Sequence, residues 1–358
     1  MNKISIIVTS TQYPGFGGGA TNSYAIIGYL RKRGYHVCGI FFHNESNQNF
    51  DPENFGNIFQ FPIYHFTNPS LLKIHQYRQK IINIMPKPSI ILSKNYLAPF
   101  LANILFPKVP NVYMITGMCN MLENCNRILP SNIDDIDILE HHQNDVTAFN
   151  LCDVIVSNSD ITHKIMLKTY PEYVNKLYHV PIDTSQYIQN IIKDHSCDNK
   201  IYDIIIVTSD MTRMEKNMLF LVNVLNNPIM NTYSKLIIGK NSDIFMKIPN
   251  SKIYDLISHK RVCELLAMSK VLLIPSLYES NPNIVREAYQ MKCLILMSNN
   301  TGYHNLFPEF SICRDYRIFN WIEKTINMIT NYDKIIIDYK IRYPDTSLEL
   351  DDLIAKYL

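Results

Sequence analysis

Two glutamates, Glu279 and Glu287, stand on either side of a predicted helix start and could hold the two ends of an extended ligand. The apolar run Val271–Pro275 before them predicts a buried parallel strand, and we place Pro282 at the first helical position behind an Asn281 cap. A helix start at the carboxyl end of a buried strand is where α/β proteins bind anions. The helical rise separates the two glutamates by about 12 Å. This spacing suits a nucleoside diphosphate sugar.

Two cations follow another predicted strand, Ile204–Thr208, in the same half of the chain. Arg213 and Lys216 lie in the loop and early turn after it, where positive charge can neutralise a diphosphate leaving group. A solvated basic loop is the alternative. The position at a strand's carboxyl end, together with the two glutamates, favours the ligand-binding interpretation.

Glycines gather after the first predicted strand. Only 11 occur in the chain, yet four of them are Gly15, Gly17, Gly18 and Gly19. Backbone N–H groups of such a loop can approach a phosphate or a sugar closely, and the following helix adds positive potential. The spacing differs from the Gly-x-Gly-x-x-Gly dinucleotide fingerprint. A tight turn without a ligand is the alternative.

Composition bounds the class of protein. The 358 residues have room for two domains, and 47% hydrophobic with 18% charged residues indicates globular cores. A net charge of +2 gives no indication of a nucleic-acid partner. The eight scattered cysteines argue against zinc and against a disulfide scaffold, so we expect reduced thiols in the cytoplasm. We expect neither a signal peptide nor a membrane span.

The elements that must position these residues alternate along the chain as strands and helices, which predicts parallel sheets. We expect an α/β protein with a Rossmann-like acceptor domain over residues 1–190, a second, donor-binding one over 200–335, and a segment over 336–358 that packs back on the first domain. The two domains would face each other across a cleft. Expected strands are Ile4–Thr9, Val37–Phe42, Ser89–Leu92, Val112–Ile115, Val154–Ser157, Leu177–Val180, Ile204–Thr208, Leu236–Ile238, Lys252–Asp255, Val271–Ile274 and Leu294–Met297. Expected helices are Asn22–Arg33, Tyr96–Leu105, Asp137–Asn150, Ile161–Lys168 and Ser347–Leu358.

Taken together, these pieces resemble the family 4 retaining glycosyltransferases, which have the GT-B fold. The segment from Pro275 through Ala288 is similar to the paired-glutamate motif of that family. The runs Val154–Ser159 and Val180–Thr184 resemble the segment that leads toward the hinge between domains. The resemblance is strongest from Asp153 to Leu306. The composition and the loop Pro14–Gly19 also resemble glycosyltransferases of large DNA viruses.

The resemblance implies a role for each site residue. Glu287 would hold the ribose hydroxyls of the donor, and Glu279 would hold the hydroxyls of its sugar. Lys216, helped by Arg213, would stabilise charge on the diphosphate as the glycosidic bond breaks. Three further contacts are implied. The backbone amides of Asn283 and Ile284 at the helix start would bind the donor, and Leu256 would contact its base. From the first domain, Gly17, Gly18 and Gly19 would cover the phosphates.

The implied reaction moves a sugar from a nucleoside diphosphate sugar to a hydroxyl of a glycan acceptor, with no metal or other cofactor and with UDP favoured over GDP. The chain departs from the family at Pro282, where glycine is frequent, and at Met211, where a cation is usual. It also has Thr116 where many members carry a histidine, and His141 and His142 are the candidate substitutes for that histidine. A sugar-nucleotide epimerase and an inactive nucleotide-sugar or glycan-binding module are therefore the alternatives.

Two further segments have competing interpretations. Asp135 and Asp137 match a metal-binding Asp-x-Asp pattern, but they follow Pro130 at a predicted helix start, where acids are favoured for the helix itself. We therefore expect no metal there. The stretch Leu71–Met85 carries cations among apolar residues. It reads as an amphipathic core helix, with peripheral contact to an anionic membrane as the alternative.

Overall fold

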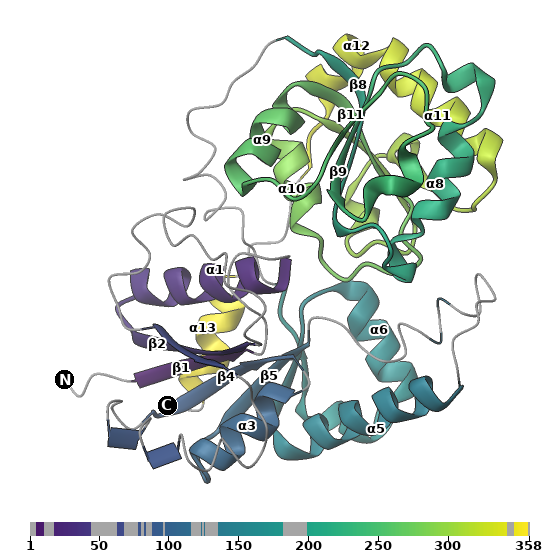
Figure 1. Cartoon of the computed structure of the whole chain (residues 1–358). Coiled ribbons are helices and arrows are strands. Elements are labelled where there is room, and N and C mark those ends of the chain that lie inside the picture. Colours follow the sequence, from purple (N-terminus) through teal and green to yellow (C-terminus); the bar gives the residue numbers. More distant parts are fainter. Residues whose placement is uncertain are drawn as a thin grey trace. The chain divides into compact units, whose positions relative to one another are not determined.

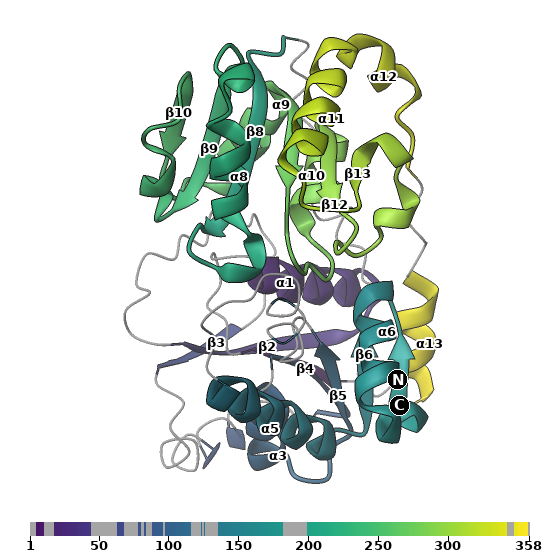
Figure 2. The ribbon, with the colours of Figure 1, turned by 90° about the vertical axis from the view of Figure 1, so that its right-hand side faces the viewer.

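The computed structural model divides the chain into two compact units. Unit 1 comprises residues 1–123, 131–184 and 344–358, and unit 2 comprises residues 124–130 and 185–343. Each unit contains one parallel sheet with helices on both faces (Figures 1 and 2). The structure describes residues 5–10, 18–43, 63–67, 78–79, 82–83, 88–95, 97–115, 123, 125, 135–181, 199–341 and 347–356.

Unit 1 holds a seven-stranded sheet in the order β3-β2-β1-β4-β5-β6-β7, with every pair parallel. Helices α3 and α5 cover one face of this sheet and α1 covers the other (Figure 1). The strands are β1 Ser5–Ser10, β2 His36–His43, β3 Ile63–Thr67, β4 Ile90–Lys94, β5 Asn111–Ile115, β6 Val154–Ser157 and β7 Leu177–His179. The helices are α1 Gly18–Lys32, α3 Leu97–Leu105, α5 Asp135–Leu151, α6 Asp160–Thr169, η2 Pro171–Lys176 and the returning α13 Ser347–Lys356.

The last helix belongs to unit 1 although it comes at the end of the chain. Asp351 of α13 forms an ion pair with Arg33, which follows α1, at 3.2 Å. Lys356 donates to the hydroxyl of Tyr178 in β7 at 2.8 Å. These contacts tie the C-terminal helix to both the first helix and the last strand of the unit.

Unit 2 holds a six-stranded sheet in the order β10-β9-β8-β11-β12-β13, again all parallel. Figure 1 shows α9 and α10 on one face and α8 and α11 on the other. The strands are β8 Tyr202–Asp210, β9 Lys235–Lys240, β10 Ser251–Tyr254, β11 Ser269–Ile274, β12 Leu294–Ser298 and β13 Ile312–Cys313. The helices are α8 Met218–Leu225, α9 His259–Ala267, α10 Asn283–Gln290, α11 Ile318–Thr330 and α12 Tyr332–Asp338, with short 3₁₀ turns η3 Met214–Lys216, η4 Pro228–Met230, η5 Ser242–Phe245, η6 His304–Leu306 and η7 Glu309–Ser311.

Apolar runs predict most of these strands because a strand covered on both faces buries every side chain. All residues of β5 and β12 are buried. The predicted strand Ser89–Leu92 is wrong at its end, since β4 continues through Ser93 and Lys94. Both polar side chains are buried, and the Ser93 hydroxyl donates to the Asn111 side chain at 2.7 Å. Strands β3 and β13 are not among the predicted elements; β13 has only two residues, too few for a pattern.

Several sequence-based predictions lie wholly or largely outside the described residues. These are Gly15, Gly17, Thr116, most of Leu71–Met85 and the segment after Pro181 up to residue 198. The six described cysteines are free thiols, as the sequence predicts. Among the described helices, none combines the length and the apolarity needed to cross a bilayer.

Candidate active site

The candidate site lies at the carboxyl ends of β8 and β11 in unit 2. These two strands are neighbours in the sheet, but the chain runs outward from them in opposite directions, to β9 and β10 on one side and to β12 and β13 on the other. Such a topological switch point is where open α/β sheets bind ligands, because the connections on its two sides diverge. Lys216 follows β8 and Glu279 follows β11, so the switch point carries one cation and one carboxylate.

The Lys216 ammonium and the Glu279 carboxylate form an ion pair. Their side chains are only 16% and 18% exposed, so the pair is largely shielded from water. Weaker screening makes each charge act more strongly on a ligand than it would on an open surface. The structure thus brings together two of the predicted catalytic residues.

The loop that carries Lys216 is fastened to the loop that carries Glu279. The Leu277 amide donates to the Glu215 carbonyl at 2.8 Å, and the Asn217 side chain donates to the Pro275 carbonyl at 3.2 Å. Asn217 has a left-handed backbone with φ of 55°, a conformation that asparagine tolerates better than most residues. It ends the 3₁₀ turn η3 and lets α8 begin at the next residue. These bonds fix the position of Lys216 on both of its sides.

Glu279 is held from its other side by the loop after β12. Its amide donates to the Asn300 carbonyl at 3.0 Å, and its own carbonyl accepts from the Gly302 amide at 2.7 Å. The two bonds form an isolated parallel bridge between Glu279 and Thr301. Backbone bonds on two sides leave the Glu279 side chain as the part that projects toward Lys216.

Arg213, the second predicted cation, occupies the cap position of η3 and forms an ion pair with Glu215. Its side chain is 47% exposed, whereas that of Glu215 is 8% exposed. Arg213 therefore lies beside the switch point, with Glu215 as its ion-pair partner.

The predicted helix start is correct in place but wrong by one residue. Helix α10 begins at Asn283, and Pro282, rather than Asn281, occupies the cap position. Pro282 has an extended backbone with ψ of 122°, and its carbonyl accepts from the Val285 amide at 3.2 Å. Asn283 and Ile284 form the first turn, where amides point toward the helix N-terminus and attract anions.

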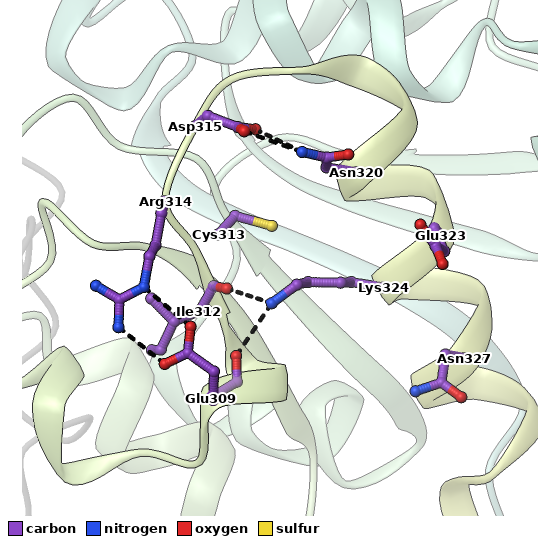
Figure 3. A pocket seen from close by; sticks show the side chains of 9 residues that line it. All are labelled: Glu309, Ile312, Cys313, Arg314, Asp315, Asn320, Glu323, Lys324 and Asn327. Carbon is purple, nitrogen blue, oxygen red and sulfur yellow. Dashed lines mark hydrogen bonds and ion pairs between the residues drawn. The ribbon is translucent and has the colours of Figure 1, made fainter.

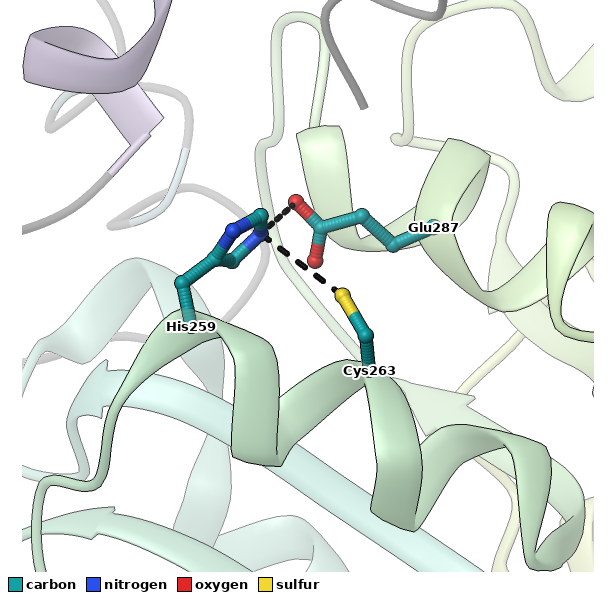
Figure 4. Close-up of side chains that lie close together, drawn as sticks. All are labelled: His259, Cys263 and Glu287. Carbon is teal, nitrogen blue, oxygen red and sulfur yellow. Dashed lines mark hydrogen bonds and ion pairs between the residues drawn. The ribbon is translucent and has the colours of Figure 1, made fainter. Parts of the chain in front are cut away.

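Glu287 lies one turn further along α10 and is buried. The Nε2 atom of His259, the first residue of α9, donates to Glu287 Oε1 at 2.9 Å (Figure 4). Burial by itself lowers the pKa of His259, but the Glu287 charge and hydrogen bonds with Cys263 and Glu287 raise that pKa well above its usual value. The His259 ring and the Glu287 carboxylate are therefore direct partners that join the start of α9 to α10.

Sequence analysis missed His259 and Cys263. They are four residues apart, which places both on one face of α9 next to Glu287. This i, i+4 spacing was the available signal, but nothing local shows that α9 packs beside α10.

The remaining predicted site residues are dispersed. Leu256 lies in the loop between β10 and α9, is 39% exposed, and has a backbone amide bonded to the Asp255 carboxylate at 2.7 Å. Gly18 and Gly19 open α1 in unit 1, and Gly17 is outside the described residues. His142 contacts the Tyr170 hydroxyl at 2.9 Å and stacks on its ring, which gives this histidine a structural partner within unit 1.

A pocket of about 350 Å³ lies elsewhere in unit 2, between η7, β13 and α11 (Figure 3). Two of its cations already have partners: Arg314 donates to both Glu309 oxygens at 2.9 and 2.8 Å, and Lys324 donates to the Ile312 carbonyl at 2.6 Å. None of the predicted site residues lines it. We therefore assign the candidate site by the switch point and not by this pocket.

Comparison with known proteins locates the chain by its fold. No protein-family model and no curated protein matches the sequence. Many solved structures are similar to this chain, and among those that match over nearly the whole length of both chains are the following three. Sucrose-phosphate synthase from Thermosynechococcus elongatus has a TM-score of 0.69 at 11% identity, covering 99% of each chain. The UDP-forming α,α-trehalose-phosphate synthase from Burkholderia xenovorans, in complex with glucose-6-phosphate, has a TM-score of 0.66 at 11% identity, covering 99% of each chain.

The third structure is an α-glucosyltransferase in complex with UDP and a 13-mer DNA that contains an HMU base. Its TM-score is 0.65 at 14% identity, and all of both chains is covered. Likeness at such low identity shows the fold alone. The chain thus has the GT-B fold, with two Rossmann-like units, as predicted from the sequence.

Proposed function

We propose that this protein is a retaining glycosyltransferase of family 4 that moves a sugar from a nucleoside diphosphate sugar to a hydroxyl of a glycan acceptor. The observation that carries the proposal is the shielded Lys216–Glu279 ion pair at the β8–β11 switch point. A lone cation there would suit any anion, and a lone carboxylate would repel a phosphate. The pair suits a ligand with an anionic part next to a polyhydroxylated part.

Lys216 and Glu279 bind different parts of the donor. The diphosphate approaches the N-terminus of α10 and shares the Lys216 ammonium, while Glu279 accepts hydrogen bonds from sugar hydroxyls. As the glycosidic bond breaks, negative charge grows on the leaving diphosphate, and Lys216 stabilises it, assisted by Arg213. Glu287 holds the ribose hydroxyls. Transfer takes place on one face of the sugar without a covalent enzyme intermediate, unlike the paired carboxylates of retaining glycosidases.

The remaining features of the proposal concern the ligand and the setting. Leu256 contacts the base, and Gly17, Gly18 and Gly19 of unit 1 cover the phosphates. UDP is favoured over GDP, which is supported by two of the similar proteins, one UDP-forming and one bound to UDP. The reaction needs no metal. We expect the protein to act in the cytoplasm, either free or in peripheral contact with a membrane. We also expect it to resemble glycosyltransferases of large DNA viruses.

A product assay tests the proposal. The purified chain is incubated with UDP-glucose and other sugar nucleotides in the presence of a chelator, with and without a panel of sugar acceptors. We expect release of nucleoside diphosphate that depends on the acceptor, with the anomeric configuration of the donor kept in the product. Glu279→Gln should abolish most of this turnover, whereas Glu309→Gln, in η7 and outside the loops that follow β8 and β11, should not. No release with any donor would contradict the proposal.

The same assay separates the alternatives. A sugar altered within its nucleotide conjugate in the absence of acceptor identifies an epimerase. Donor binding that is unaffected by Glu279→Gln, together with no turnover, identifies an inactive binding module.

A further inference from the structure

Three side chains with metal-ligating atoms converge between α9 and α10. They are His259, Cys263 and Glu287, and Figure 4 shows all three pointing toward a common centre. Their ligand atoms all lie within 4.8 Å of one another. Within the described part of the chain, no other group of three histidine, cysteine or acidic side chains meets this condition.

The distances suit a metal ion at the centre. Zinc–ligand bonds of 2.0 to 2.3 Å place tetrahedral ligand atoms about 3.3 to 3.8 Å apart. The observed separations are 2.9 Å from His259 Nε2 to Glu287 Oε1 and 3.9 Å from Nε2 to Cys263 Sγ. The third separation, from Cys263 Sγ to the Glu287 carboxylate, is at most 4.8 Å, so side-chain rotations alone would bring the three atoms to coordination distance. Packing fixes the rest, since Cys263 and Glu287 are 0% and 4% exposed.

The donor set selects the kind of ion. A thiolate with an imidazole and one carboxylate is a sulfur, nitrogen and oxygen set, which suits Zn²⁺ and its neighbours and does not suit Mg²⁺ or Ca²⁺. Three protein ligands leave a fourth coordination position open. The His259 side chain is 22% exposed, which provides an entry path for an ion from solvent.

We propose that His259, Cys263 and Glu287 bind one divalent transition-metal ion of the zinc class. The site has a consequence that rests on the proposed function: Glu287 is also assigned to the donor ribose. An ion that occupies this carboxylate excludes the ribose hydroxyls from it. The ion is thus an inhibitor of donor binding and takes no part in the transfer itself.

Cobalt titration of the reduced, metal-free protein tests the site. One equivalent of Co²⁺ should produce a thiolate-to-cobalt charge-transfer band, which one equivalent of Zn²⁺ should remove. Cys263→Ala should lose the band, while Cys293→Ala, at another buried cysteine of unit 2, should keep it. His259→Gln should weaken Co²⁺ binding by more than about 100-fold, because even second-shell losses cost 10–100-fold. Circular dichroism checks that each variant folds.

Absence of the band, or a band that survives in Cys263→Ala and His259→Gln, overturns the metal site. Competition is measured by calorimetric titration of UDP with and without one equivalent of Zn²⁺. Zinc should weaken UDP binding at least about tenfold in the natural chain, because two ligands that need one carboxylate exclude each other. The effect should vanish in Cys263→Ala, which also controls for zinc bound by UDP itself.

The two claims fail separately. A cobalt band that depends on Cys263, with UDP affinity unchanged by zinc, overturns the competition. If UDP does not bind the metal-free protein at all, the proposed function fails, and the cobalt titration still decides the metal site.

Discussion

Lys216 and Glu279 are 63 positions apart in the sequence, yet their charged groups form an ion pair at the carboxyl ends of two adjacent strands. The pair depends on the change in strand order at the switch point. The chain first adds β9 and β10 on one side of β8 and then returns to place β11 on the other side. Backbone and side-chain bonds between the two loops then hold the charges together. A donor diphosphate would share a cation that the fold has already placed.

Replacing Lys216 tests its proposed role in the transition state. Lys216→Met should lower kcat by about 100- to 1000-fold with little change in KM, because charge on the diphosphate develops mainly as the bond breaks. Steady-state kinetics with saturating acceptor measures both constants. Lys247→Met, at an exposed position beyond η5, is the control and should behave as the natural chain. A rise in KM with kcat unchanged would show that Lys216 only binds the donor.

Substitutions of Asn217 test whether its left-handed backbone, next to Lys216, is strained for other residues. Asn217→Ala loses the bond to the Pro275 carbonyl and also places a Cβ atom at φ of 55°, where it is sterically disfavoured. Asn217→Gly loses only the bond. The alanine variant should therefore be less stable than the glycine variant by about 1–2 kcal/mol. Urea unfolding measures this difference. Equal stabilities would mean that the left-handed backbone carries no strain.

Lys235 is a buried lysine at the start of β9, the second strand of the unit 2 sheet. Its ammonium donates to three carbonyls, of Met230, Tyr233 and Pro249, at 2.7, 2.9 and 2.8 Å. Lys235→Met should lower the free energy of unfolding by about 1–3 kcal/mol, because it removes three hydrogen bonds to carbonyls from a buried position. The exposed Lys252→Met on β10 should leave the urea midpoint unchanged. A stable Lys235→Met protein would show that water or rearrangement replaces the ammonium.

The lowered pKa of Asp203 predicts that the folded protein loses stability in acid. Burial by itself raises its pKa, but hydrogen bonds from the Ser234 amide and side chain and from Lys270 lower it below the usual value. A depressed folded pKa contributes stability that is present above the unfolded value of about 3.9 and is lost as pH falls through the folded pKa.

The stability difference between the natural chain and Asp203→Asn should therefore be full at neutral pH and shrink below about pH 4. Urea unfolding across this pH range measures it. A difference that stays constant down to the acid end would contradict a lowered pKa.

The sequence predicted the parallel strands well because a strand covered on both faces must be apolar throughout. The same rule explains the failure at the end of β4. Lys94 is only 1% exposed, and burial lowers its pKa to about 7. No periodicity rule places a lysine inside a sheet, so its burial is decided by surrounding structure that a local pattern does not contain.

The candidate site divides in a similar way. Glu279 and Lys216 were predictable as site residues because each follows an apolar run that identifies a strand end. The partnership of His259 with Glu287 was not, because it depends on how two separate helices pack on one face of the sheet. The predicted start of α10, at Pro282, is one residue too early, because proline suits both the first helical position and an extended cap residue.

Calorimetric titration of UDP into the metal-free protein, with chelator present, tests the central claim most directly. We predict binding in a single-site isotherm that Glu287→Gln weakens at least about tenfold, because hydrogen bonds to a charged carboxylate are worth about 1.5–3 kcal/mol. Glu309→Gln, an exposed carboxylate of the same unit, should bind UDP as the natural chain does. No binding of UDP, or of GDP, ADP and TDP in turn, would contradict a nucleotide-sugar site at the β8–β11 switch point.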